Sequence, residues 1–227
     1  MLDASTLIVV FGKAPQAGRV KTRLAPLLGD AGAARLHARL LERTVATALA
    51  AGCGPVELHG SPALHGSLRS LAERHGIRLV GQGRGDVGDR MLLAFREGLR
   101  RYRRMVLVGS DCPCLGPADL GRAARALHTC DAVIAPAEDG GYPLIGLRKV
   151  SPVVFEGVAW STGEVMAQTR TRLERLGWRL RELRTVWDLD RPEDVLRLRA
   201  SGLLRRPTPS PAVYHSPRRT TVPGASA

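Results

Sequence analysis

A loop near the start of the chain concentrates basic side chains. Lys13, Arg19, Lys21 and Arg23 lie within the segment GKAPQAGRVKTRLAPLLG, which contains no carboxylate. Unpaired cations in a glycine-containing loop attract anions, and the loop after the first strand of an open α/β sheet is where a nucleotide phosphate binds. The segment lacks the Gly-Lys-Ser/Thr order of a Walker motif, which argues against a P-loop NTPase. We therefore predict that all four cations bind phosphate and that Lys21 is also catalytic; a solvated basic loop is the alternative.

A carboxylate follows a buried strand in the segment VLVGSDCPCL. Asp111 comes directly after Gly109 and Ser110, at the carboxyl end of the strand expected over residues 105–108. A carboxylate at that place can hold Mg²⁺ or Mn²⁺ through oxygen, and such a cation neutralises a diphosphate leaving group. Asp111 is thus predicted to be a metal ligand, and capping of the following turn is the alternative.

Two further segments place carboxylates near strand ends. In PAEDGGYPLIGL, Asp139 precedes two glycines that let backbone approach a ligand. We predict a catalytic Asp139, as general base or as binder of the transferred group, although Asp-Gly is equally typical of a hairpin turn. In TVWDLDRPEDV the side chains alternate across a strand, so only one of the two central aspartates faces inward. We expect Asp188 to be a second metal ligand and Asp190 to cap the last helix, with a place in the site as the alternative for Asp190.

The four cysteines favour neither a zinc site nor a disulfide scaffold. Cys112 and Cys114 form C-x-C, and His128 and Cys130 form H-x-C, without the two-residue gaps common among zinc ligands. We expect free thiols, as in a reducing cytoplasmic compartment. His37 and His75 lie on expected helices, and no Ser or Cys in a nucleophile elbow accompanies them, so covalent catalysis is disfavoured.

The elements that must position these residues alternate between strands and helices. Continuous apolar runs bounded by glycine and proline indicate buried strands, and apolar residues at helical spacing indicate helices. The expected strands are 7–11, 56–59, 77–80, 105–108, 131–136, 142–147 and 183–189. The expected helices are 30–51, with Asp30 as a possible N-cap, 64–75, 88–102, 117–127, 162–176 and a last one from Pro192.

This order predicts a three-layer αβα protein with a mostly parallel, Rossmann-like sheet. The connection before strand 142–147 is too short for a parallel crossover, so one antiparallel strand is expected. The 227 residues fit one domain over 1–204. Residues 205–227 contain five prolines and no carboxylate, which is typical of a disordered, basic, proline-rich tail.

Composition excludes several classes of protein. With 44% hydrophobic and 24% charged residues, the chain is neither fibrous nor disordered as a whole, and no apolar run is long enough to span a membrane. The net charge is +13, but all except three of the 34 cations are arginines, a skew that genome base composition explains as readily as nucleic-acid binding. With 4% aromatic residues and no recognition motif, binding to nucleic acid is disfavoured.

Six ordered segments resemble a known family over about residues 7–200. They resemble the GT-A-fold glycosyltransferases of the arsenosugar-biosynthesis type, and more distantly 2-phospholactate guanylyltransferase and the molybdenum-cofactor nucleotidyltransferases. The segments are GKAPQAGRVKTRLAP, QGRGDVGDRM, GSDCPCL, PAEDGGYPLIGL, WSTGEVMAQT and DLDRPEDV.

The resemblance implies a GT-A, nucleotide-diphospho-sugar transferase-like domain with a nucleotide bound across the first half of the sheet. The basic loop would contact the phosphates, and the segment from Gln82 to Gly88 would lie near the base, both of these residues being binding candidates. Asp111 would be the metal aspartate of the fold, and Asp139 would lie on the acceptor side.

The resemblance also implies that residues 160–162 lead a helix that helps to close the pocket. Two positions depart from the family pattern. Ala17 stands where relatives often carry a second proline, and Pro143 stands where an aromatic residue usually follows Tyr142. The second departure affects the acceptor pocket.

The function expected first is metal-dependent glycosyl transfer. Mg²⁺ or Mn²⁺ on Asp111 and Asp188 would hold a nucleoside diphosphate-sugar while a small-molecule acceptor hydroxyl attacks the anomeric carbon. The alternative is nucleotidyl transfer, in which a phosphorylated acceptor attacks the α-phosphate of an NTP and pyrophosphate leaves; the basic loop suits the extra charge of a triphosphate. A nucleic-acid-binding protein is the third hypothesis.

Overall fold

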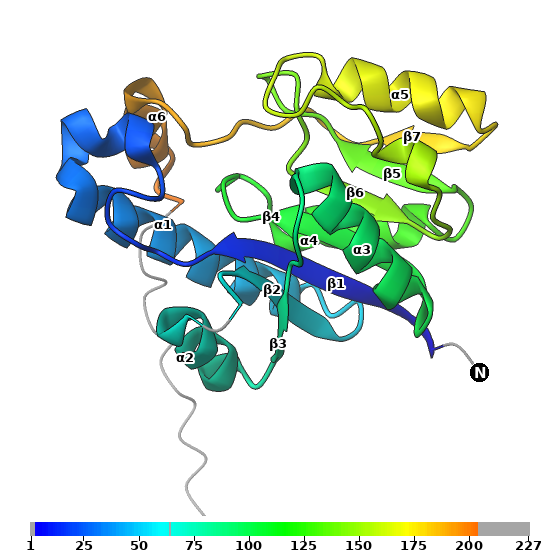
Figure 1. Cartoon of the computed structure of the whole chain (residues 1–227), viewed down its shortest axis with the longest axis horizontal. Coiled ribbons are helices and arrows are strands. Elements are labelled where there is room, and N and C mark those ends of the chain that lie inside the picture. The colour runs from blue at the N-terminus through cyan, green and yellow to red at the C-terminus, as the bar shows by residue number, and fades with distance from the viewer. Residues whose placement is uncertain (1–2, 64, 204–227) are drawn as a thin grey trace, which may run out of the picture.

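The computed structural model describes residues 3–63 and 65–203 and contains a seven-stranded sheet between helices (Figure 1). The expected tail at 205–227 lies outside the described residues. The strands are β1 (Asp3–Lys13), β2 (Val56–Ser61), β3 (Arg78–Gly81), β4 (Tyr102–Gly109), β5 (Ala132–Ala135), β6 (Leu144–Leu147) and β7 (Leu180–Glu182). The helices are α1 (Ala25–Ala50), α2 (Gly66–His75), α3 (Val87–Leu99), α4 (Pro117–Ala126), α5 (Val165–Arg175) and α6 (Pro192–Ser201), with short 3₁₀ turns η1 (Thr22–Leu24) and η2 (Pro152–Val154).

The sheet has the order β3-β2-β1-β4-β6-β5-β7. Strand β6 runs antiparallel to both β4 and β5, which confirms the one antiparallel strand, and the other pairings are parallel. The chain moves outward from β1 to β3 and then returns to place β4 on the other side of β1. This reversal creates a topological switch point at the carboxyl ends of β1 and β4, where ligands of open α/β sheets bind.

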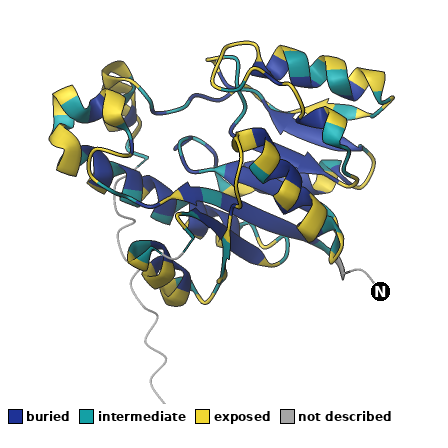
Figure 2. Cartoon of the chain, viewed as in Figure 1, coloured by how far each residue is buried: buried dark blue, intermediate teal, exposed yellow. Residues whose placement is uncertain are grey.

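Side chains alternate along the central strands and divide the core into two layers. Ile8 and Val10 face a cluster that includes residues of α1, α2 and α4, whereas Leu7 and Val9 face residues of α3 and α5. Figure 2 shows the sheet buried and the outer helix faces exposed. A third cluster joins α1 to α6 through Leu24 and Leu40, among others. The three-layer α/β fold is therefore confirmed.

Two sequence predictions were wrong at element boundaries. The expected strand 183–189 is displaced: β7 ends at Glu182, and a single bridge between Ala137 and Val186 continues the pairing, because Pro136 has no N–H with which to extend β5. Helix α3 stops at Leu99, since the sheet recruits Tyr102 opposite Asp3 of the long strand β1.

Two expected helix caps are also corrected. Helix α1 begins at Ala25, but non-helical Gly29 (φ 67°) divides it, so its long part starts at Asp30 as expected, and Gly29, not Asp30, is the non-helical residue that precedes this part. The N-cap of α6 is Arg191, not Asp190, because the carboxylate of Asp194 accepts hydrogen bonds from both backbone N–H groups that precede the helix (2.7 and 3.0 Å).

No helix within the described part of the chain is long and apolar enough to cross a lipid bilayer.

Candidate functional site

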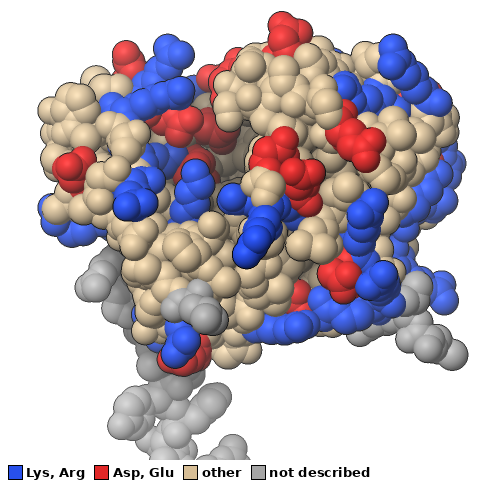
Figure 3. All heavy atoms as spheres, viewed as in Figure 1, with Lys and Arg blue, Asp and Glu red and all other residues tan. Residues whose placement is uncertain are grey.

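Ionisable side chains from three distant segments converge at the switch point. The loop after β1 supplies Lys21, the loop after β4 supplies Asp111, and the segment that leads from β7 to α6 supplies Asp188 and Asp190. That last segment crosses from the β7 edge to α6, which lies beside α1 (Figure 1). In Figure 3, acidic and basic side chains surround a hollow on this face of the molecule.

Lys21 lies at the centre of the charged cluster. Its Nζ atom is 2.9 Å from Oδ1 of Asp111 and 2.8 Å from Oδ1 of Asp190, and it donates a hydrogen bond to the carbonyl oxygen of Leu189 (2.6 Å). Its side chain is only 4% exposed. Burial alone would lower the pKa of Lys21, but the two carboxylates outweigh burial and raise it. The lysine is therefore a fixed cation that ties the loop after β1 to the two acidic segments.

Asp111 remains ionised although one of its oxygens is buried. Burial would raise its pKa, but His37 and Lys21 outweigh burial and hold the pKa well below its usual value. His37 reaches it from α1: Nε2 lies 3.0 Å from the carbonyl oxygen of Lys13, and Nδ1 lies 3.7 Å from Oδ1 of Asp111. Because a carbonyl oxygen only accepts, Nε2 carries a proton and fixes the ring.

The pKa of Asp188 is shifted in the opposite direction to that of Asp111. Its Oδ1 atom is buried and accepts no hydrogen bond within the described residues. Burial, followed by the charges of Asp139, Asp111 and Asp190, raises the pKa of Asp188 to about 7. The structure thus brings all four aspartates of the sequence prediction into one electrostatic cluster, with one cation inside it.

The donors present fit a divalent metal only in part. An unpartnered buried carboxylate oxygen on Asp188, facing the ionised Asp111, is the kind of hard donor that Mg²⁺ and Mn²⁺ prefer. Across residues 3–63 and 65–203, however, no three His, Cys, Asp or Glu side chains are arranged as a ready-made metal site. Two carboxylates suffice where substrate phosphates complete the coordination, which is the usual arrangement for Mg²⁺.

The other cations of the basic loop surround this cluster. Lys13, Arg19 and Arg23 are exposed, and Arg23 makes only a distant contact with Asp190 (3.9 Å). Lys21 itself has the left-handed backbone conformation (φ 49°), which few non-glycine residues adopt. This turn directs the lysine inward, toward Asp111.

The two residues expected near a nucleotide base have clear structural surroundings. Gln82 is buried, and its side-chain amide donates to the carbonyl oxygens of Gly12 (3.2 Å) and His59 (2.8 Å) at the ends of β1 and β2. Gly88, in the first turn of α3, lies directly beneath the indole of Trp160, so that a Cβ atom there would lie 2.5 Å from Nε1. Trp160 in turn packs edge-on against Tyr142. Contact of Gln82 or Gly88 with a base stays a prediction.

Asp139 forms a turn and also faces the cluster. Its Oδ1 atom accepts a hydrogen bond from the backbone N–H of Gly141 (3.0 Å), as in an Asx turn. Gly140 (φ 85°) packs against the backbone of Gly163, and its carbonyl oxygen accepts a hydrogen bond from the N–H of Met166 at the start of α5 (2.8 Å). The exposed Asp139 is therefore held at a fixed place between the sheet and α5.

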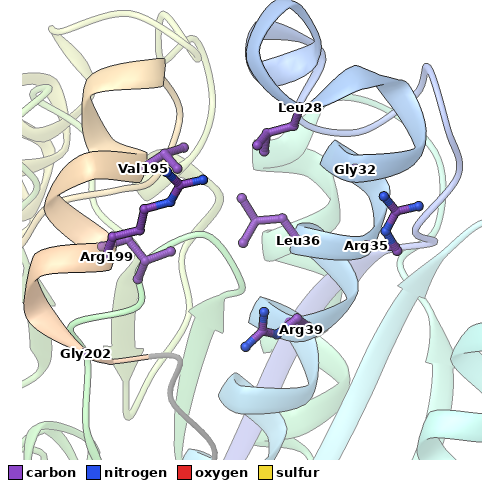
Figure 4. Close-up of a pocket in the computed structure, with 9 residues that line it drawn as sticks. Leu28, Gly32, Arg35, Leu36, Arg39, Val195, Arg199 and Gly202 are labelled. Atoms are coloured by element: carbon purple, nitrogen blue, oxygen red, sulfur yellow. The ribbon is translucent and has the colours of Figure 1, made fainter.

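A separate hollow of about 590 Å³ lies between α1 and α6, away from the carboxylates. Leu28 and Leu36 of α1 point toward Val195 of α6, and arginines flank them (Figure 4). None of the described residues that line this hollow is acidic. It does not contain the chemistry assembled around Lys21.

One contributor to the site was ranked second by the sequence reasoning and another was missed. Asp190 was assigned first to a helix cap, yet it pairs with Lys21. His37 was treated as an ordinary helical histidine, yet it is 3% exposed and lies against Asp111. A histidine within the apolar stripe of α1 was the available signal, because a buried imidazole needs partners.

Comparison with solved structures agrees with this architecture. A protein from Desulfovibrio desulfuricans G20, classed as a nucleotide-diphospho-sugar transferase, is 29% identical over 88% of each chain with a TM-score of 0.81. The fold is also shared with CMP:2-keto-3-deoxy-manno-octonic acid synthetase in complex with CTP (14% identity, 87% of this chain and 98% of that one, TM-score 0.57). Rv0371c from Mycobacterium tuberculosis H37Rv, in complex with manganese, is 21% identical over 87% of this chain and 100% of that one, with a TM-score of 0.50.

These likenesses confirm the nucleotide-diphospho-sugar transferase-like fold, while the narrower resemblance to arsenosugar-type enzymes stays a prediction. No curated protein sequence matches the chain at a significant level. A family model matches residues 44–162, just over half of the chain, and this stretch includes Asp111, Asp139 and Trp160. The chain belongs to this family, which is described as "uncharacterized protein conserved in bacteria (DUF2064)".

Proposed function

We propose that the protein is a divalent-metal-dependent glycosyltransferase that uses a nucleoside diphosphate-sugar as donor and a small molecule as acceptor. The observation that carries the proposal is the meeting of Lys21, Asp111 and Asp188 at the switch point between β1 and β4. The likeness at 29% identity to a protein classed as a nucleotide-diphospho-sugar transferase supports the same class.

The donor's diphosphate would lie between the basic loop and the carboxylates. Lys13, Arg19 and Arg23 are exposed and can bind phosphate oxygens, which places negative charge beside the loop that Lys21 anchors. Asp111 and Asp188 would hold the metal, which when bound neutralises charge on the leaving diphosphate. The ammonium of Lys21 keeps the opposing carboxylates in place, because it pairs with Asp111 and Asp190 at once.

The acceptor would approach from the side of β6 and α5. Asp139 is exposed there and is fixed by the Gly140 contact with the start of α5, so its carboxylate can take a proton from an acceptor hydroxyl. Tyr142 and Trp160 form an aromatic pair beside it, with ring centroids 6.4 Å apart. Aromatic faces of this kind suit the apolar face of a sugar or a comparable small acceptor.

Nucleotidyl transfer is the second candidate, and the basic loop favours it. Three exposed cations in addition to the engaged Lys21 provide more positive charge than a diphosphate requires, and a triphosphate would use it. A phosphorylated acceptor would then attack the α-phosphate, and pyrophosphate would leave.

A thermal-shift panel separates the two candidates. The purified full chain would be melted with nucleoside triphosphates, diphosphates and diphosphate-sugars, each with and without Mn²⁺, since a ligand that binds only the folded state raises the melting temperature. A Mn²⁺-dependent shift with one diphosphate-sugar supports glycosyl transfer. A shift confined to triphosphates, followed by acceptor-dependent pyrophosphate release, replaces it with nucleotidyl transfer.

Matched variants locate the response. Asp111→Asn should abolish the Mn²⁺-dependent shift, whereas Glu138→Gln should retain it. Glu138 is the exposed neighbour of Asp139 and pairs only with Arg197 in the described structure (2.7 Å), outside the cluster. An Asp111→Asn variant that responds like the parent contradicts the assignment of the metal ligand.

A further inference from the structure

The dithiol Cys112–Cys114 lies within the candidate site and has no role in the proposed transfer. The two Sγ atoms are 3.4 Å apart, within contact distance. Cys112 is buried and directly follows Asp111, whereas Cys114 is partly exposed. The other two cysteines, Cys53 and Cys130, lie elsewhere in the fold.

The loop that carries the dithiol is fixed on both sides. Arg43 donates a hydrogen bond to the carbonyl oxygen of Pro113 (3.1 Å), and Arg184 donates one to that of Cys114 (2.8 Å). The N–H of Leu115 lies 3.4 Å from the carbonyl oxygen of Cys112, which closes a turn. The sulfur atoms are thus held together by backbone contacts that do not depend on the thiols.

The same loop connects the two metal-ligand segments of the proposed site. The thiol of Cys114 contacts the carbonyl oxygen of Trp187 (3.7 Å), the residue before Asp188. The carbonyl oxygen of Asp111 accepts a hydrogen bond from the N–H of Leu189 (2.9 Å), the residue after Asp188. The thiol of Cys114 and the backbone of Asp111 therefore both contact the segment that carries Asp188.

From this geometry we propose that Cys112 and Cys114 are an oxidative modification site whose disulfide weakens metal binding at Asp111 and Asp188. Hydrogen peroxide is the oxidant: the thiolate of Cys114 attacks one peroxide oxygen, forming a sulfenic acid and releasing hydroxide, which takes up a proton to give water. The sulfur of Cys112 then attacks the sulfenic sulfur, a second water leaves, and the S–S bond forms. Two thiols are oxidised by two electrons, and one peroxide is reduced to two waters.

Bond formation requires the two sulfur atoms to move. They must approach from 3.4 Å to about 2 Å. The thiol of Cys114 is consumed and no longer donates to the carbonyl oxygen of Trp187, so a contact between this loop and the segment that carries Asp188 is lost. A change of this kind in the groups that orient metal ligands typically lowers affinity by about 10- to 100-fold.

The test separates the disulfide from its effect. The full chain would be treated with hydrogen peroxide, its free thiols counted, and its peptides mapped by mass spectrometry, which requires no metal. We expect two of the four thiols to disappear, with a link between Cys112 and Cys114. Mn²⁺ binding, measured by calorimetry with the metal alone, should weaken by about 10- to 100-fold on oxidation and recover with dithiothreitol.

Single variants complete the experiment. Cys114→Ser should prevent both the disulfide and the loss of Mn²⁺ affinity, and Cys112→Ser provides a second route to the same result. Cys53→Ser is the matched control and should behave like the parent. Retention of all four thiols, or a disulfide that leaves Mn²⁺ affinity unchanged, overturns the proposal. This inference rests on the proposed function only where it concerns Mn²⁺ binding. If the reduced protein does not bind Mn²⁺, the proposed metal site is contradicted. The thiol count tests the disulfide independently of the metal.

Discussion

Glu57 offers a quantitative test of the buried charge network that supports the sheet. It lies near the start of β2, at the end of the sheet opposite the candidate site. Arg101 donates two hydrogen bonds to its carboxylate (2.8 and 3.1 Å), and the ring of His59 lies 3.2 Å away. The Glu57 side chain is 5% exposed and that of Arg101 is 39% exposed, so a buried carboxylate pairs with a half-buried guanidinium.

The direction and size of the effect follow from the pKa. Burial would raise the pKa of Glu57, but the hydrogen bonds from His59 and Arg101 outweigh burial and lower it from 4.5 to about 2. A carboxyl whose pKa is depressed in the folded state stabilises the protein above the unfolded pKa, and the contribution is lost as the pH falls toward the folded pKa. The difference between a pKa of 4.5 and one of about 2 corresponds to a contribution of about 3 kcal/mol to the free energy of unfolding at pH 7. Less than half of this contribution remains at pH 3.

Glu57→Gln is the perturbation, because glutamine resembles the protonated acid in shape and charge. Urea unfolding of parent and variant between pH 7 and pH 3 should show a stability gap of about 3 kcal/mol at pH 7 that narrows as the pH falls. The difference in the free energy of unfolding between the two proteins at each pH cancels the contributions of the titratable groups that they share. Mn²⁺ binding should be unchanged, since the network lies away from the carboxylate cluster.

Glu42→Gln is the matched control for this experiment. Glu42 pairs with one arginine and one histidine, Arg74 (2.6 Å) and His75 (2.7 Å), and its side chain is 43% exposed, whereas the buried Glu57 has Arg78 at 3.4 Å in addition to Arg101 and His59. Solvent screens such a pair, so its loss should cost about 1 kcal/mol or less. Equal destabilisation by the two variants, or a Glu57→Gln gap that does not depend on pH, refutes the reasoning.

Three further outcomes follow from contacts in the site. Gly88→Ala places a methyl group against Trp160 and should destabilise the protein by about 1–3 kcal/mol in urea unfolding, whereas Gly66→Ala, which meets no atom within 4 Å, should not destabilise it. Gly140→Ala combines a positive φ (85°) with a backbone clash and should weaken donor and acceptor binding as well as lower the melting temperature. Lys21→Met removes the cation that holds Asp111 and Asp190 in place, so calorimetry should show weaker binding both of Mn²⁺ alone and of the nucleotide; unchanged or tighter binding of Mn²⁺ would contradict this positioning role.

Most of the architecture could be predicted because it depends on local patterns. The apolar runs of β1 and β4 and the helical spacing in α1 are visible over ten or twenty residues. The antiparallel direction of β6 could be predicted because the connection that precedes it is too short for a parallel crossover. The prediction of a strand at 183–189 was wrong because its pairing partner, β5, ends before a proline. Which strand will pair with a segment cannot be predicted from the residues of that segment alone.

The candidate site could be predicted as a set of residues but not as an arrangement. Asp111, Asp139 and Asp188 were identified from their places after strands, and Lys21 from its loop. That the lysine would turn inward and pair with Asp190 depends on a left-handed backbone at Lys21 and on a segment 169 residues away. Neither has a signal in the local sequence, and so Asp190 was assigned to the helix that follows it.

The family match covers only some of the residues of the candidate site. Residues 44–162 include the strand end with Asp111 and the turn with Asp139, but they leave out the basic loop, Lys21 and Asp188. The electrostatics of Asp111 nevertheless depend on Lys21, and those of Asp188 depend on Asp111 and Asp139. Each charge is therefore set in part by groups from outside the segment that carries it. The specific chemistry of this chain therefore depends on how its two ends fold back across the switch point.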